Sequence, residues 1–99
     1  MSVGVIYRFR ARDGKAAELL TLLQGARDFS LTVDGCEGFV VYQGKDEQHL
    51  FVMVETWRSE QIHEAHFEKN ARGSGWLAQV EALMTQPLEP LQASRFVLR

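Results

Sequence analysis

A chain of 99 residues is long enough for one domain and too short for two, because each half would lack a core of its own. Hydrophobic residues make up 45% and charged residues 24%, as is usual for a globular domain. The formal net charge of −2 gives no electrostatic reason to expect nucleic acid or an anionic membrane as a partner. The sequence therefore predicts a single domain over residues 1–99.

Two features indicate the compartment. The first residues lack the basic segment followed by an apolar stretch that marks a secretory signal, and no apolar run approaches the ~18–20 residues of a membrane span. Cys36 is the only cysteine, so the chain cannot form an internal disulfide, which suits a reducing compartment. We expect a cytoplasmic protein.

The first half of the chain predicts a strand, a helix and a second strand. Apolar and polar side chains alternate over residues 3–12, as in a half-buried strand. Asp13 is the expected N-cap of a helix over residues 14–32, whose leucines and alanines recur at helical spacing. Residues 39–44 form the expected second strand.

The second half begins with a predicted third strand over residues 50–57, joined to the second strand by a hairpin loop. Ser59 is the expected N-cap of a helix over residues 59–69, and Ser74 that of a helix over residues 75–85. Gln86 and Pro87 should end the latter helix. The fourth strand is expected at residues 95–99, with a start as early as Leu91 as an alternative.

This β-α-β-β-α-β order predicts a ferredoxin-like α+β fold with an antiparallel sheet. From the right-handed crossover rule we expect the first and third strands to be neighbours at the sheet centre and to run parallel. Both faces of the third strand are apolar: Leu50, Val52 and Val54 alternate with Phe51, Met53 and Trp57. Since the helices cover only one face, we expect a homodimer in which two sheets pack face to face.

The junction after the third strand is rich in scarce residue types. On a helical wheel of ~100° per residue, His66 lies between Ile62 and Phe67, inside the arc that must face the sheet. His63 lies nearer the edge of that arc. Three readings remain open: histidines in the core, a metal site with Glu55 as third ligand, or a pocket walled by Trp57, His66 and Phe67.

Three segments resemble one known family. "VETWRSEQIHEAHF" is similar to the E-x-W…A-H segment of the antibiotic biosynthesis monooxygenase (ABM) superfamily, "DGCEGFVVYQ" to its turn into strand two, and "FRARDGKAAELLTLL" to its first strand, turn and helix. The resemblance covers roughly residues 3–87. It implies a dimeric α/β barrel, and the oxygenation of quinols or polycyclic phenols by O₂ without a metal, flavin or haem, so that no cofactor is expected.

The resemblance also suggests site residues. It carries Trp57 and His66 over as candidate catalytic residues, and histidine is the natural group to handle a proton near neutral pH. Met53 and Phe67 are expected to form an aromatic slot together with Trp57. Tyr7, Arg8 or Tyr42 would orient a substrate oxygen, although Arg8 and the arginines after it could equally form a solvated or ion-paired strand end with Glu47 or Glu55.

Other functions fit less well or stay open. The haem-degrading branch of the family uses an asparagine on its first strand, where this sequence has Tyr7, which predicts against haem degradation. RNA-recognition modules of the same element order carry a basic and glycine-containing third strand, and "HLFVMVETW" has neither feature. A non-catalytic ligand-binding or structural dimer remains an alternative.

Overall fold

The computed structural model describes residues 1–86 and 93–99 and confirms the ferredoxin-like α+β fold. The elements follow the expected β-α-β-β-α-β order, with the second helical region divided into three pieces. In chain order they are β1 (Val3–Arg10), α1 (Ala16–Ser30), β2 (Cys36–Gln43), β3 (Leu50–Trp57), α2 (Glu60–His66), the π-helix η1 (Phe67–Arg72), α3 (Trp76–Ala82) and β4 (Ala93–Val97).

The four strands form one antiparallel sheet in the order β2-β3-β1-β4. The first and third strands are central neighbours, as expected, but the expectation that they run parallel is wrong: Val3 pairs with Trp57 and Arg10 with Leu50. The crossover through α1 makes β1 parallel to β2, the strand that it joins. A hairpin then reverses the chain into β3, which fills the space between them and is antiparallel to both.

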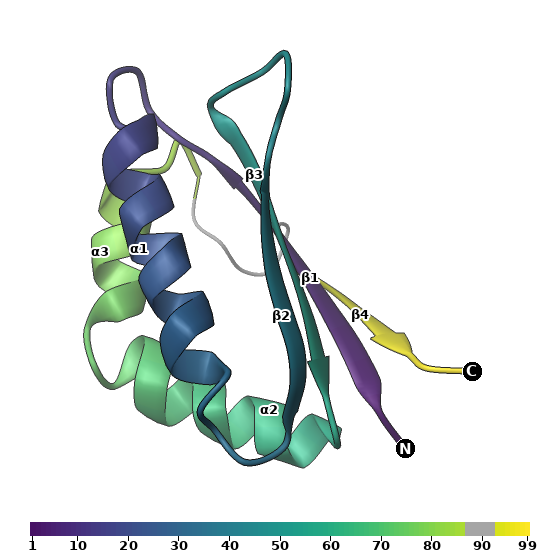
Figure 1. Ribbon diagram of the computed structural model, residues 1–99. Helices are drawn as coiled ribbons and strands as arrows, with labels where there is room; N and C mark the ends of the chain where they lie inside the picture. Colours follow the sequence, from purple (N-terminus) through teal and green to yellow (C-terminus); the bar gives the residue numbers. More distant parts are fainter. Residues whose placement is uncertain (87–92) are drawn as a thin grey trace.

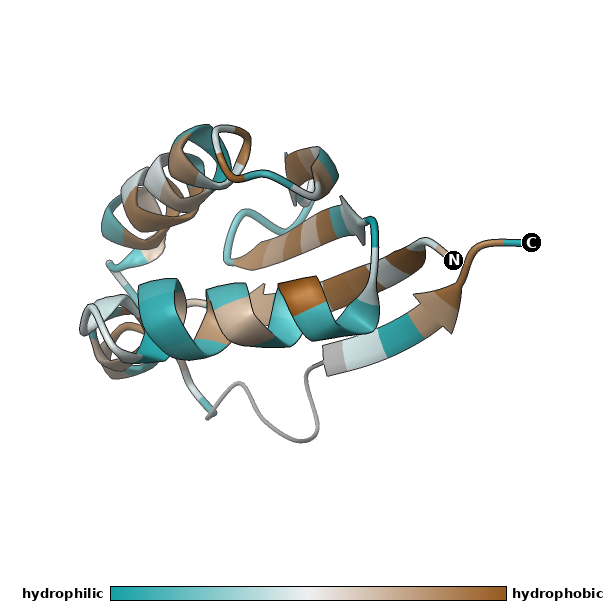
Figure 2. Ribbon diagram, turned by 90° about the horizontal axis from the view of Figure 1, so that it is seen from below, coloured by the Kyte–Doolittle hydropathy of each residue, from teal (hydrophilic) through white to brown (hydrophobic). Residues whose placement is uncertain are grey.

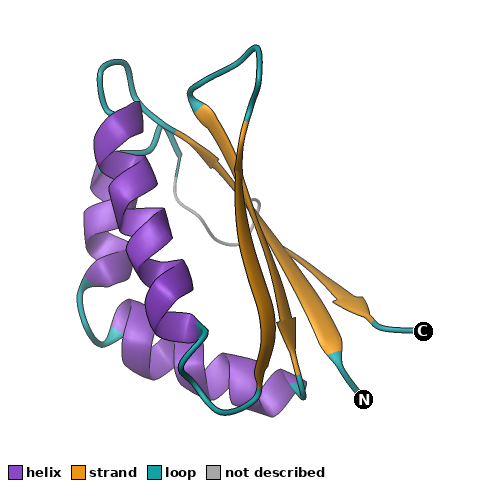
Figure 3. Ribbon diagram, viewed as in Figure 1, coloured by secondary structure: helices purple, strands orange, loops and turns teal. Residues whose placement is uncertain are grey.

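All the helices lie on one face of the sheet (Figure 1), and the core lies between these two layers (Figure 3). On this inner face β1 contributes Val5, Tyr7 and Phe9, each at most 1% exposed. The inner residues of β3 and two leucines of α1 close the core, together with the end of the helical region; they are Phe51, Met53, Trp57, Leu19, Leu23, Val80 and Met84. The alternation along β1 and β3 therefore separates inner from outer residues as predicted.

No described element covers the outer face of the sheet (Figure 1). Leu50, Val52 and Val54 of β3 point outward and are half-buried, while Val40 and Tyr42 of β2 are 43% and 59% exposed. In Figure 2 brown segments recur along the strands and are interrupted by pale and teal ones. This outer face is the apolar surface from which the sequence predicts a dimer.

The ends of the helices show which capping predictions hold. Asp13 is not the N-cap of α1, which begins two residues later than expected, after Lys15 and without a side-chain cap. Ser59 caps α2 as predicted, because its hydroxyl accepts the N–H of Ile62 at 3.2 Å. The Ser74 hydroxyl accepts the N–H of Trp76 at 3.2 Å, although the position directly before α3 is Gly75, at φ 86°.

The last strand pairs with β1 and is shifted from the prediction. β4 ends at Val97, two residues before the expected end of the strand. Before it, α3 ends at Ala82, three residues earlier than the predicted end at residue 85, while Pro87 and the alternative start at Leu91 lie outside the described residues. Within residues 1–86 and 93–99, no helix is long and apolar enough to span a bilayer.

Candidate functional site

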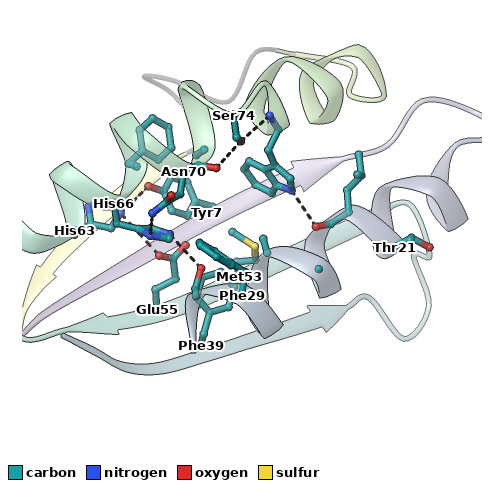
Figure 4. Close-up of a pocket in the computed structure, with 17 residues that line it drawn as sticks. Tyr7, Thr21, Phe29, Phe39, Met53, Glu55, His63, His66, Asn70 and Ser74 are labelled. Atoms are coloured by element: carbon teal, nitrogen blue, oxygen red, sulfur yellow. Dashed lines mark hydrogen bonds and ion pairs between the residues drawn. The ribbon is translucent and has the colours of Figure 1, made fainter. Parts of the chain in front are cut away.

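A cavity of about 350 Å³ lies between the helices and the inner face of the sheet (Figure 4). Its wall is mainly apolar and aromatic, with Phe29 from α1, Phe39 from β2, Met53 from β3 and Phe67 and Trp76 from the second helical region. The indole N–H of Trp76 donates to the Leu22 carbonyl oxygen at 3.0 Å, which ties α3 to α1 beside the cavity. The volume and lining are those of a site for a small organic molecule.

Titratable groups meet at the buried end of this cavity. The Tyr7 hydroxyl and the His63 Nε2 atom share a hydrogen bond of 3.0 Å. The same His63 nitrogen lies 3.9 Å from the Glu55 Oε1 atom, which accepts the indole N–H of Trp57 at 2.8 Å. Glu55 is 3% exposed and His63 is 2% exposed, so both groups are removed from water. Elements β1, β3 and α2 thus bring a phenol, a carboxyl and an imidazole together.

Burial shifts the pKa values of this cluster strongly. Loss of water raises the pKa of Glu55 from 4.5 to about 7, and the hydrogen bond from Trp57 offsets only part of this rise. Loss of water, together with the nearby charges of Arg95 and His66, lowers the pKa of His63 from 6.5 to about 4. At neutral pH His63 is therefore uncharged, and Glu55 is close to its titration midpoint.

His66 lies beside this cluster with both ring nitrogens engaged. Its Nδ1 atom is 3.0 Å from the Asn70 amide nitrogen, which can only donate, so Nδ1 accepts. The ring proton then sits on Nε2, which donates to the Ser30 hydroxyl at 3.1 Å. Burial lowers the pKa of His66. The centroid of the Trp57 ring is 4.6 Å from that of His66, so the indole supports the imidazole from behind.

The structure brings four of the predicted site residues to the cavity. Tyr7, Met53, His66 and Phe67 line it, and the rings of Tyr7 and Phe67 stack with centroids 6.2 Å apart. Trp57 is fully buried and does not line the cavity, but it contacts two residues that do, Glu55 and His66. Two members of the predicted slot, Met53 and Phe67, therefore line the cavity, and the third, Trp57, lies behind its wall.

Arg8 and Tyr42 do not reach the cavity, which corrects the expectation that they orient a substrate oxygen there. Both are exposed and alternate with inward residues of β1 and β2, so their side chains belong to the outer face. The strand-end alternative for the arginines holds at Arg10, whose guanidinium forms an exposed ion pair with Glu47 at 2.6 Å.

His63 is the clearest error of the helical wheel. The wheel places it near the edge of the sheet-facing arc, yet it is more deeply buried than His66. A wheel gives the angle between side chains but not the direction of the sheet, and α2 turns His63 toward Tyr7. No group of three or more His, Cys, Asp or Glu side chains in the described part of the chain is placed to hold a metal ion.

Glu55, Ser30 and Asn70 are site residues that sequence reasoning did not place in the pocket. A signal existed for Glu55: it lies two residues from both Met53 and Trp57 along β3 and therefore shares their inward face. No comparable signal marks Ser30 or Asn70, because their contacts with His66 depend on how α1 packs against the second helical region.

Comparison with known families and structures gives a consistent picture. The model of the family described as antibiotic biosynthesis monooxygenase matches residues 2–72, which include β1, β3, α2 and every titratable group of the cavity named above. A search of curated proteins finds no match.

Solved structures share the fold along the whole chain. Rv0793 from Mycobacterium tuberculosis has a TM-score of 0.86 at 25% identity, over 100% of this chain and 96% of that one. PA3566 from Pseudomonas aeruginosa has a TM-score of 0.77 at 24% identity, over 99% and 95%. A protein proposed to be an antibiotic biosynthesis monooxygenase, from Nitrosomonas europaea, has a TM-score of 0.84 at 19% identity, over 99% and 98%.

Proposed function

The chain belongs to the antibiotic biosynthesis monooxygenase family, and from this we propose that it oxygenates a quinol or phenolic aromatic substrate with O₂, without a metal, flavin or haem. The observation that carries the proposal is the cavity of about 350 Å³, which combines aromatic walls with a buried group of proton-exchanging side chains. An aromatic substrate needs the former, and its activation by loss of a proton needs the latter.

The proposed reaction needs no electron donor other than the substrate. A quinol that reacts with O₂ can give a hydroxylated quinone and water: one oxygen atom enters the ring, and the other leaves with two hydrogens of the substrate. The ionised quinol is itself the electron donor, so the protein has to bind it beside O₂, exclude bulk water and remove a proton. Apolar walls suit both O₂ and an aromatic ring.

Several cavity residues have a place in this proposal. Phe67 and Met53 would hold the ring, and the Tyr7 hydroxyl would orient a substrate oxygen from the buried end of the cavity. The sequence predicts His66, supported by Trp57, as a proton-handling group, but Asn70 and Ser30 occupy both of its ring nitrogens.

Oxygen uptake on reduced naphthoquinones, measured in the presence of EDTA, tests the proposal. We expect the protein to exceed the uncatalysed rate, to release a hydroxylated quinone and to keep its activity in EDTA. A protein that gains thermal stability with 1-naphthol but consumes no oxygen would instead be the non-catalytic ligand-binding alternative.

A cavity-blocking variant locates the activity. Ala26 lies on the cavity side of α1 and Ala17 on its exposed side, so the same substitution can be made at both positions. Ala26→Phe should lower oxygen uptake by ~10-fold or more, since the new ring competes with the substrate for volume. Ala17→Phe should leave it unchanged. Equal rates for the two variants would place the reaction elsewhere on the molecule.

A further inference from the structure

Building on the proposed function, we propose that the Glu55 carboxylate, and not a histidine, accepts the proton that the phenolic substrate loses. Glu55 lies on the inner face of β3 and lines the cavity. Its Oε1 atom is fixed by the Trp57 indole N–H at 2.8 Å, which holds the carboxyl group in place at the buried end. A substrate hydroxyl that enters this end meets Glu55 beside the Tyr7–His63 pair.

The groups around Glu55 keep its carboxylate basic. It faces Tyr7 from β1 and His63 from α2, with His66 one turn further along α2 and the Cys36 thiol on β2. Arg95 of β4 acts on His63. Burial raises the pKa of Glu55, and the hydrogen bond from the neutral indole of Trp57 offsets only part of this rise, so the carboxylate is more basic than a glutamate in water.

The three candidate acceptors differ in basicity and in availability. A phenol has a pKa of ~10. Glu55, with a pKa of about 7, is closer to that value than His63, with a pKa of about 4. The pKa of His66 is also below its usual 6.5, and its only accepting nitrogen already binds Asn70. Proton transfer is most effective between groups of similar pKa, which favours Glu55.

The proposed transfer is balanced. The substrate O–H bond breaks, its electron pair stays on the substrate oxygen, and the proton forms a bond to the Glu55 carboxylate, which becomes a neutral acid. The single negative charge has then moved from Glu55 to the substrate. The substrate anion reduces O₂, the co-reactant of the proposed function, and the Glu55 proton leaves in the water that is produced.

The experiment compares quinol oxygenation between pH 5.5 and 8.5 in the parent and three variants, after subtraction of the uncatalysed rate. Glu55→Gln keeps the shape and the bond from Trp57 but cannot take a proton. It should lower kcat ~10²–10⁴-fold with little change in KM, and His66→Ala should lower kcat less. Glu64→Gln removes an exposed carboxylate of α2 and should have no effect.

The pH dependence of the rate provides a second test. The parent kcat/KM should rise with pH and level off above a midpoint near 7, where Glu55 is ionised, and Glu55→Gln should lose this step. An active parent with an equally active Glu55→Gln, or a larger loss in His66→Ala, overturns the role of Glu55 alone. If Glu55→Gln does not fold, a parent profile without a step near 7 has the same meaning. A parent that consumes no oxygen overturns the proposed function together with this role.

Discussion

Glu55 and His63 ionise in the reverse of their usual order. In water a glutamate loses its proton near pH 4.5 and a histidine near 6.5, whereas here the pKa values are about 7 and about 4. Between these two pH values the pair holds one proton, which resides on Glu55, and both side chains are neutral. Two ionisable groups can therefore lie 3.9 Å apart at the buried end of the cavity without a buried charge.

This reversal predicts opposite effects on stability that cancel in the parent. The raised pKa of Glu55 favours the folded state at low pH and loses this effect as the pH rises from 4.5 to 7. The lowered pKa of His63 favours the folded state above pH 6.5 and loses this effect as the pH falls to 4. With respect to this pair, the free energy of unfolding of the parent should hardly change between pH 4.5 and 6.5.

Single variants should reveal the two opposing contributions. In Glu55→Gln the free energy of unfolding should rise by about 3 kcal/mol between pH 4 and 6.5, and in His63→Gln it should fall by about 3 kcal/mol between pH 4.5 and 7. Urea unfolding at four pH values measures both slopes. Parallel pH curves for the parent and both variants would show that the two groups ionise as they do in water.

At the level of elements, the sequence predicts the strands and the start of α2 well because their causes are local. Alternation identifies β1 and β3, and the serine hydroxyl at position 59 identifies the start of α2. The π-helix η1 has no such local signal. The sequence predicts an α-helix up to residue 69, whereas the structure changes to the wider π-helical turn at Phe67. The hydrogen bonds of His66 could not be predicted from local patterns either. One joins it to α1, which is distant in the sequence, and the other joins it to η1, whose π-helical turn the sequence does not indicate.

Two glycines allow a matched test of how the turn before β2 packs against α2. Gly35 precedes β2 with φ 99°, and an added Cβ atom would lie 2.7 Å from the Ile62 Cγ2 atom of α2. Gly25 is a helical residue of α1 with open space around an added Cβ. Gly35→Ala should therefore cost ~1–3 kcal/mol of stability, whereas Gly25→Ala should add ~0.5–1 kcal/mol. Chemical denaturation of both variants checks the signs, and a stable Gly35→Ala would show that α2 can move away from the turn.

At the level of the whole molecule, the two faces of the sheet differ in how they are covered. The inner face packs against the helices and contains the cavity, and the outer face has no cover from the described residues. Exposed Val40 and Tyr42 lie on this outer face beside Val52 and Val54. A second copy of the chain, bound through the same face, would bury this apolar surface by a symmetric contact.

We therefore expect a homodimer of about twice the 11.3 kDa chain mass in sedimentation equilibrium at micromolar concentration. Val52→Lys places a charge at the centre of the outer face and should shift the protein to a monomer of lower thermal stability. Gln24→Lys adds the same charge to the exposed side of α1 and should leave the mass unchanged. A parent that sediments as a folded monomer would contradict the prediction.

The alternation along β3 has a consequence for how this family can diverge. Its odd-numbered residues face inward, where Met53 and Glu55 line the cavity, and its even-numbered residues form the outer face. Substitutions at the inward residues can therefore alter substrate preference, and substitutions at the outward residues can alter self-association, without affecting each other. A single inserted or deleted residue would exchange the two sets at once. We expect length variation among relatives to be absent from this strand and to concentrate in connections such as residues 44–49, where a change of length leaves both surfaces intact.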